Sequence, residues 1–223
     1  IDMARRLGVT SDLEPLPSIA LGSTELTLLE LTTAYAHLAA GGNIVYPYGI
    51  LAIDTAHGEP VYRRQASGGV VLRPSIVGEM NEMLLGVVNH GTGRAAQIGR
   101  PVAGKTGTTS DYRDAWFIGF APQLVTGVWV GNDDNTPMKK VTGGMLPASI
   151  WHHFMQVALE HLPVAGIPTS GSSFVSLPWQ SETPAYPPQP GEPHVNSPPP
   201  QSGPRTVTLG KSFWDKLFAA PPR

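Results

Sequence analysis

Proline limits how much of this chain can fold. Nine of its 23 prolines lie before residue 163, and fourteen lie within residues 163–223. Proline lacks a backbone N–H, and a stretch rich in proline, serine and glycine buries too little apolar surface to pay for ordering. We therefore predict a globular part at residues 1–162 and an extended, disordered linker at 163–205.

The segment after this linker, residues 206–223, has a different character. Phe213, Trp214, Leu217 and Phe218 gather on one face of a possible short helix that Ser212 would cap. One hypothesis is a docking peptide for a partner or a membrane surface, carried on a flexible tether. A disordered chain end is the equally supported alternative.

Within residues 1–162 the apolar residues follow helical and strand periods in turn. A capping box runs from Thr27 to Glu30, Gly41-Gly42 stops that helix, and Pro74 begins the next one. Helices that cover an antiparallel sheet form a mixed α/β (α+β) layered fold. The other predicted elements are a helix end at 1–8, a hairpin of 44–53 with 61–64, strands at 101–108, 114–120 and 124–131, and a last helix at 147–162.

The apolar spacing of the two later helices also predicts which face each one buries. On the helix from Pro74 the stripe is Met80, Met83, Leu84 and Val87, and on the last helix it is Ile150, Phe154, Val157 and Leu162.

Composition excludes several classes of function. A formal net charge of −2 argues against nucleic acid as a main partner, and the absence of cysteine excludes disulfides and thiolate metal sites. No apolar run is long enough to cross a membrane. His152-His153 are neighbours on a helix and should face apart, and Asp133-Asp134-Asn135 lacks the glycine and distal glutamate of a calcium loop. We predict neither a metal nor a cofactor.

The segment Lys105-Thr106-Gly107-Thr108 combines one cation, a small residue and two hydroxyls on a β-prone stretch. The ammonium supplies charge, the threonines supply hydrogen-bond donors, and the glycine lets a ligand backbone approach closely. These residues predict a surface that binds a carboxylate. Arg113-Asp114 lies nearby in sequence, where we expect a structural ion pair.

The same residues also fit a phosphate-binding loop, because residues 99–106 match G-x-x-x-x-G-K-[ST]. That motif works only where a helix leaves the loop and directs its N–H groups at the phosphates. Residues 106–110 are poor helix formers, and a strand is the next predicted element. Nucleotide binding is therefore the alternative, and carboxylate binding is the main prediction. A dinucleotide-like pattern at 91–96 follows a helix, not a strand, so it predicts only a glycine loop.

Several runs together resemble one family. A Lys-Thr-Gly segment is the third signature of serine acyltransferases such as penicillin-binding proteins and serine β-lactamases. Over about residues 1–160 the chain resembles the C-terminal part of the transpeptidase domain of class A, bifunctional penicillin-binding proteins, and this resemblance implies part of the fold shared by penicillin-binding proteins and serine β-lactamases. The runs that carry it are 17–22, 28–35, 89–93, 102–109, 114–120, 128–134 and 143–148.

The resemblance implies a D,D-transpeptidase that cross-links peptidoglycan stem peptides ending in D-Ala-D-Ala and is acylated by β-lactams. It assigns Lys105 to the serine of the family's second motif and to positive potential. It assigns the hydroxyls of Thr106 and Thr108 to the terminal carboxylate, and the Thr108 N–H to the oxyanion hole. Gly107 is expected to be small so that substrate can lie along the strand.

The family's other two signatures, Ser-x-x-Lys and Ser-x-Asn, do not occur in these 223 residues. We therefore expect them upstream of Ile1, in the rest of a parent transpeptidase domain, and expect this chain alone to be inactive. A glycosyltransferase domain and an N-terminal membrane anchor are expected in the same parent, with the domain on the periplasmic side of the bacterial inner membrane. Alternatives are a non-catalytic muropeptide-binding module and a β-lactamase, which the long proline-rich tail disfavours.

Overall fold

The computed structural model describes residues 1–64 and 68–171, which fall into two compact units. One unit comprises residues 1–47 and 68–171, and the other comprises residues 48–64. The predicted linker beyond residue 171 and the predicted docking segment at 206–223 lie outside the described residues.

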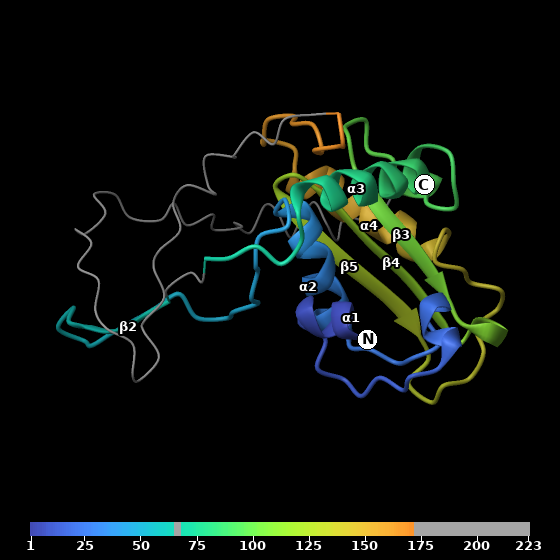
Figure 1. Ribbon diagram of the computed structural model, residues 1–223, viewed down its shortest axis with the longest axis horizontal. Coiled ribbons are helices and arrows are strands. Elements are labelled where there is room, and N and C mark those ends of the chain that lie inside the picture. The colour runs from blue at the N-terminus through green and yellow to red at the C-terminus, as the bar shows by residue number, and fades with distance from the viewer. Residues whose placement is uncertain (65–67, 172–223) are drawn as a thin grey trace, which may run out of the picture. The chain divides into compact units, whose positions relative to one another are not determined.

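The larger unit is built on a three-stranded antiparallel sheet in the order β3-β4-β5 (Figure 1). Its strands are β3 (Ala103–Thr108), β4 (Asp114–Ala121) and β5 (Leu124–Gly131). The central strand β4 is the most buried of them, as expected for a strand paired on both sides and covered on both faces. The predicted strands and the hairpin that joins β4 to β5 are confirmed.

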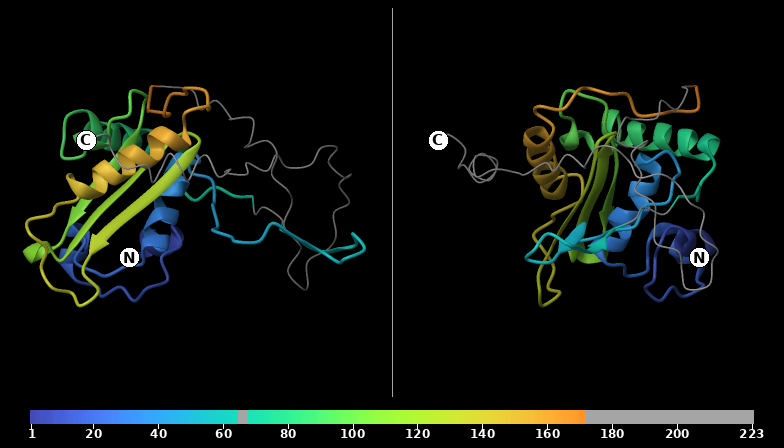
Figure 2. Two further views of the ribbon diagram at one scale, coloured as in Figure 1. Left: turned by 180° about the vertical axis from the view of Figure 1, so that it is seen from behind. Right: turned by 90° about the vertical axis from the view of Figure 1, so that its left-hand side faces the viewer.

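Helices cover both faces of this sheet (Figure 2). Helix α2 (Leu28–Ala39) and helix α3 (Pro74–Asn89) lie on one face, and helix α4 (Leu146–Ala158) lies on the other. Because side chains alternate along a strand, Phe117 packs into the core under α4, while Phe120 packs into the core under α2 and α3. The predicted layered fold is therefore confirmed. The shorter elements of the unit are α1 (Asp2–Arg6) and the 3₁₀ turns η1 (Pro17–Leu21), η2 (Arg94–Ala96) and η3 (Ser110–Tyr112).

Local signals placed the start and end of α2 correctly. Thr27 accepts a hydrogen bond from the Glu30 backbone, and the Glu30 carboxylate accepts one from the Thr27 N–H, which completes the predicted capping box. The chain turns after the helix at Gly41 and Gly42, where φ is +69° and +90°. These left-handed values suit glycine because it has no Cβ.

The predicted buried stripes of α3 and α4 are wrong in part. Met83 is 60% exposed, and the buried face of α3 is instead built on Val77, Leu84 and Val88. Ile150 is 42% exposed and Leu162 is also exposed, since α4 ends at Ala158 and turns a different side to the sheet. That side carries Ala148, Trp151 and Met155, all fully buried.

Residues 163–171 pack against α3, so the packed part of the chain reaches past Leu162, where the sequence placed its end. Ile167 is 7% exposed and belongs to the core cluster under α3. The Asn81 side chain donates to the Pro168 carbonyl over 2.9 Å, and the Ser170 N–H donates to Glu82 over 3.0 Å.

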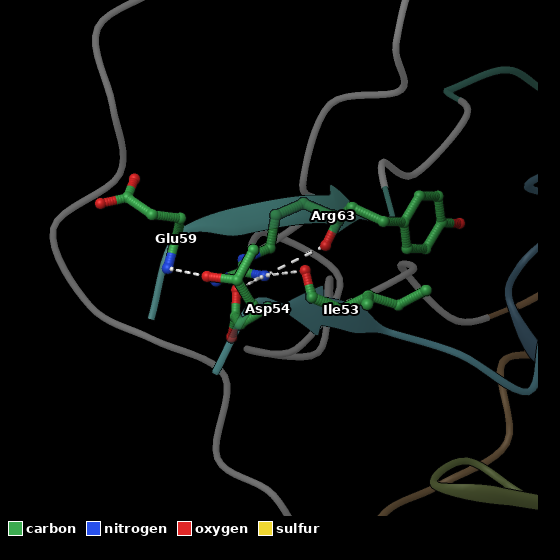
Figure 3. A network of polar contacts seen from close by, with 6 residues as sticks. Ile53, Asp54, Glu59 and Arg63 are labelled. Atoms are coloured by element: carbon green, nitrogen blue, oxygen red, sulfur yellow. Dashed lines mark hydrogen bonds and ion pairs between the residues drawn. The ribbon is translucent and has the colours of Figure 1, made fainter. Parts of the chain in front are cut away.

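The smaller unit is a hairpin of β1 (Ala52–Asp54) and β2 (Pro60–Arg63), shown in Figure 3. The Arg63 guanidinium pairs with the Asp54 carboxylate and donates to the Tyr62 carbonyl over 3.0 Å, and the Glu59 N–H donates to the Thr55 hydroxyl over 3.1 Å.

The first hairpin strand is shorter than the predicted 44–53. Asn43 bridges to Val70 instead, and the Ile44 N–H bonds the Gly69 carbonyl over 2.9 Å. Pro47 has no N–H to give to a ladder and separates the two pairings. Within residues 1–64 and 68–171, no helix combines the length and the apolar character required to span a bilayer.

Candidate active site on strand β3

The four residues of the predicted carboxylate surface all lie in β3, an edge strand of the sheet. By strand alternation, Lys105 and Gly107 belong to the face covered by α2 and α3, while Thr106 and Thr108 belong to the face covered by α4. Lys105 and Thr108 are exposed and Thr106 is half-buried. The four predicted residues therefore lie together on one strand, but their side chains divide between the two faces of the sheet.

All four residues lie at the edge of the sheet where no further strand of residues 1–64 and 68–171 pairs with β3, called the free edge below. The Thr109 N–H donates to the Asp114 carbonyl over 3.0 Å, which makes this pair a hydrogen-bonded one in the antiparallel ladder. Because such pairs alternate, Gly107 bonds across to Trp116, while the backbone groups of Thr106 and Thr108 point away from β4. The Lys105 ammonium donates to the Thr106 carbonyl over 2.8 Å at this same edge.

The hydroxyls of the two threonines are each held by a residue outside the strand. Thr106 Oγ1 lies 2.7 Å from Thr92 Oγ1, and Thr108 Oγ1 accepts a hydrogen bond from the Gly143 N–H over 3.0 Å. No role was predicted for Thr92 or Gly143 individually. Their signals in the sequence were the glycines around them and their place in the runs 89–93 and 143–148, which carry the family resemblance.

Gly143 and Gly144 bring the chain before α4 directly onto the β3–β4 ladder. A β-carbon on Gly143 would overlap the carbonyl oxygens of Trp116 and Gly107, and one on Gly144 would overlap the carbonyl oxygen of Thr92. Only residues without a side chain allow this approach. Gly107 is also confined, because its β-carbon would lie 3.2 Å from the Trp116 β-carbon on the neighbouring strand.

Beside the site, Asp114 has different partners from the one predicted. Its carboxylate accepts from the Trp129 indole N–H over 2.9 Å and from the Thr109 hydroxyl over 3.3 Å. Arg113 instead donates to the Asn135 carbonyl. The expected Arg113–Asp114 ion pair is therefore not formed, because each group is already bonded elsewhere.

Three titratable groups with displaced pKa values lie on α2 instead of β3. Hydrogen bonds from Ser11 and then Thr10 lower the pKa of Glu30 well below its usual range. Burial raises the pKa of Tyr35 to about 12 and lowers the pKa of His37, whose ring nitrogen contacts the Thr33 carbonyl. Of the three, Glu30 joins α2 to Thr10 and Ser11 of the preceding segment. What β3 itself offers to a ligand is hydrogen bonding and the positive charge of Lys105.

Two alternative chemistries can be compared with this geometry. Lys105 lies inside a strand that runs on to Thr108, and the next elements along the chain are η3 and β4. No α-helix therefore begins directly after Lys105, as a phosphate-binding loop requires. Among the described residues, no three His, Cys, Asp or Glu side chains gather as metal ligands would. The His152 and His153 rings lie 5.2 Å apart and do not face apart as expected, and His153 contacts the Ser149 carbonyl.

Comparison with known proteins identifies the family. Residues 13–156 match the penicillin-binding protein transpeptidase domain. The chain belongs to this family. Penicillin-binding protein 1A of Aquifex aeolicus is 38% identical to this chain over 165 residues, which are 73% of the chain and 23% of that protein. The chain thus spans about a quarter of the length of the curated relatives that it matches.

Solved structures agree with this assignment. PonA1 of Mycobacterium tuberculosis in complex with penicillin V superposes with a TM-score of 0.69 at 24% identity, covering 83% of this chain and 54% of that one, a likeness of fold. The ceftriaxone acyl-enzyme complex of penicillin-binding protein A from the same organism gives a TM-score of 0.54 at 26% identity, covering 66% and 40%. The resemblance seen in the sequence and the transpeptidase fold are confirmed.

Proposed function

We propose that this chain supplies the carboxylate-binding half of a serine-type D,D-transpeptidase within a longer class A penicillin-binding protein. The observation that carries the proposal is the free edge of β3, where the Lys105 ammonium and the outward backbone of Thr106 and Thr108 lie together in a chain of this family. An extended peptide can add to such an edge through main-chain hydrogen bonds.

In the proposed reaction, a serine supplied from upstream of Ile1 attacks the carbonyl of the penultimate D-Ala. An ester bond forms, the amide bond breaks, and the terminal D-Ala leaves after its nitrogen takes up a proton. The amino group of a second stem peptide then attacks the ester, which forms the cross-link and returns the proton to the serine oxygen.

In these steps the residues of β3 stabilise the negative charges of the oxyanion and of the terminal carboxylate. The Thr108 N–H, directed outward at the edge, is one donor to the oxyanion, and losing such a donor typically raises the barrier by about 3 kcal/mol. The hydroxyls of Thr106 and Thr108 donate to the terminal carboxylate of the stem peptide. Lys105 adds positive potential and bonds the serine of the second motif.

β-Lactams are the proposed inhibitors, since they carry a carboxylate beside a reactive amide and are bound by the relatives named above. We further propose that the complete protein carries a glycosyltransferase domain and an N-terminal membrane anchor, with this domain on the periplasmic side of the inner membrane. The chain by itself is then inactive, because the serine is not among its residues.

The first test is to sequence the coding DNA upstream of Ile1 and to express the complete protein. Ser-x-x-Lys followed by Ser-x-Asn is the expected finding, together with covalent labelling by a fluorescent penicillin. Residues 1–223 alone should remain unlabelled. A complete protein that lacks both motifs and takes up no label would be a non-catalytic muropeptide-binding module.

The second test is Lys105→Ala in the complete protein. Because a hydrogen bond to a charged group contributes about 1.5–3 kcal/mol, the second-order rate constant for labelling should fall by about 10- to 100-fold. Lys139→Ala is the matched control, since Lys139 is also exposed but lies in the loop after β5. Equal labelling by both variants would refute the role of Lys105.

A further inference from the structure

The hydroxyl of Thr92 is part of the site, although it comes from a separate element. Thr92 lies in the loop between α3 and η2, and its Oγ1 atom is 2.7 Å from Thr106 Oγ1. Both oxygens can donate or accept, so this contact fixes two hydroxyls at once.

The backbone around Thr92 is held from three sides. The N–H groups of Gly91 and Gly93 bond the Val87 carbonyl at the end of α3 over 3.1 and 2.9 Å. On the sheet side, a β-carbon on Gly93 would lie only 3.1 Å from the Phe117 ring of β4. On the third side, Gly144 approaches the Thr92 carbonyl so closely that it has no room for a β-carbon. The hydroxyl is thus presented to Thr106 by a backbone with little freedom to move.

Thr106 and Thr108 differ in whether the hydroxyl proton is free to bond a ligand. A hydroxyl has one proton to donate and two lone pairs to accept with. Thr108 Oγ1 accepts from the Gly143 N–H, which can only donate, so the Thr108 proton is left for a ligand. For Thr106 the same result requires Thr92 to be the donor in their contact. If Thr106 donated to Thr92 instead, its single proton would not be available to an anion.

We propose that Thr92 is a positioning residue for the carboxylate site: it donates its hydroxyl proton to Thr106 Oγ1 and so directs the Thr106 proton to the carboxylate of the stem peptide or β-lactam. This inference rests on the proposed transpeptidase function. It gives the site a pair of equivalent donors, each with its oxygen fixed by a group outside β3.

The test uses the complete protein and benzylpenicillin, whose carboxylate is the probe, with the second-order acylation rate constant as the readout. Thr92→Val keeps the size of the side chain and removes the hydroxyl, while Thr92→Ser keeps the hydroxyl and removes the methyl group. We expect an approximately ten-fold loss for Thr92→Val and a rate within about two-fold of the wild type for Thr92→Ser, as a lost hydrogen bond of ordinary strength predicts. Thr92→Ala provides the same comparison if valine disturbs folding.

A double-mutant cycle then tests whether Thr92 acts through Thr106. In a Thr106→Val background the acceptor is gone, so adding Thr92→Val should change acylation by less than about two-fold. The same ten-fold loss in both backgrounds, or a Thr92→Ser variant as slow as Thr92→Val, would overturn the inference. If the wild-type protein itself is not acylated, the proposed function fails first and the inference with it, which separates the two failures.

Discussion

Replacing Gly143 with alanine should lower the stability of the protein, because the segment before α4 packs directly on the backbone of the β3–β4 ladder. Gly143 is buried, and a β-carbon there would overlap two carbonyl oxygens, those of Trp116 and Gly107, and lie 2.9 Å from the Gly107 nitrogen. All three atoms belong to the backbone of the β3–β4 ladder, so no side chain can rotate away. The loop must move, and the bond from the Gly143 N–H to Thr108 Oγ1 is lost with it.

The size of the effect follows from these two terms. Forcing an extra methyl group into a packed site typically costs about 1–3 kcal/mol, and a lost hydrogen bond costs about 0.5–1.5 kcal/mol. Gly143 does not have a positive φ, so backbone strain adds nothing. We expect the free energy of unfolding to fall by about 1.5–4.5 kcal/mol, which corresponds to a fall in melting temperature of about 3–18 °C for a folding domain of roughly 150–250 residues.

Gly86→Ala is the matched control, and differential scanning calorimetry of the complete protein is the assay. Gly86 lies inside α3 with open space where its β-carbon would go, so alanine should stabilise the helix by about 0.5–1 kcal/mol. A Gly143→Ala protein that melts within about 1 °C of the wild type and is acylated equally fast would refute the packing argument.

Three further measurements test other parts of the molecule. Glu30→Ala should cost about 1 kcal/mol at neutral pH, the usual value of a helix cap. Hydrogen bonds, led by that of Ser11, lower the pKa of Glu30 in the folded protein. Its contribution to the free energy of unfolding is therefore present above about pH 4.3 and is lost as the pH falls through the lower folded-state pKa. The difference in melting temperature between Glu30→Ala and the wild type should shrink in acid and should not stay constant. Trp151→Phe removes the donor that bonds the Thr126 carbonyl over 3.0 Å, and a loss of about 1–3 kcal/mol in urea unfolding is expected. Ile167→Ala should cost about 2–4 kcal/mol if its segment is part of the packed unit, whereas a change below about 0.5 kcal/mol would place it in a linker.

Much of the fold could be read from the sequence because its signals are local. The capping box at Thr27 needs only the four residues that form it, and the β4–β5 hairpin needs only two β-prone runs and a short turn. The absence of a helix after Lys105, which distinguishes the strand from a phosphate-binding loop, follows in the same way from the poor helix formers at 106–110.

Local sequence could not predict which face of helix α4 is buried. Both possible stripes of α4 are apolar, one through Ile150 and Phe154 and the other through Trp151 and Met155. The second stripe packs on the sheet for two reasons. Trp151 lies over Gly119, where a β-carbon would come within 3.0 Å of the indole ring, so the glycine leaves room for it. The Trp151 N–H also donates to the Thr126 carbonyl on β5. A helical period of 3.6 residues identifies an apolar stripe, but it cannot choose between two such stripes on one helix.

The residues of the candidate site could be predicted from the sequence, since Lys105, Thr106, Gly107 and Thr108 are neighbours in one strand. Which groups these residues offer to a ligand depends on how the chain packs in three dimensions. The register of the β3–β4 ladder directs the backbone groups of Thr106 and Thr108 to the free edge. Thr92, 14 positions from Thr106, and Gly143, 35 positions from Thr108, contact the hydroxyls of these two residues. The physical reason is that a residue's type and its neighbours are encoded along the chain, whereas the partner of a hydroxyl is whichever group the packing of α3, β4 and α4 brings within 3 Å of it.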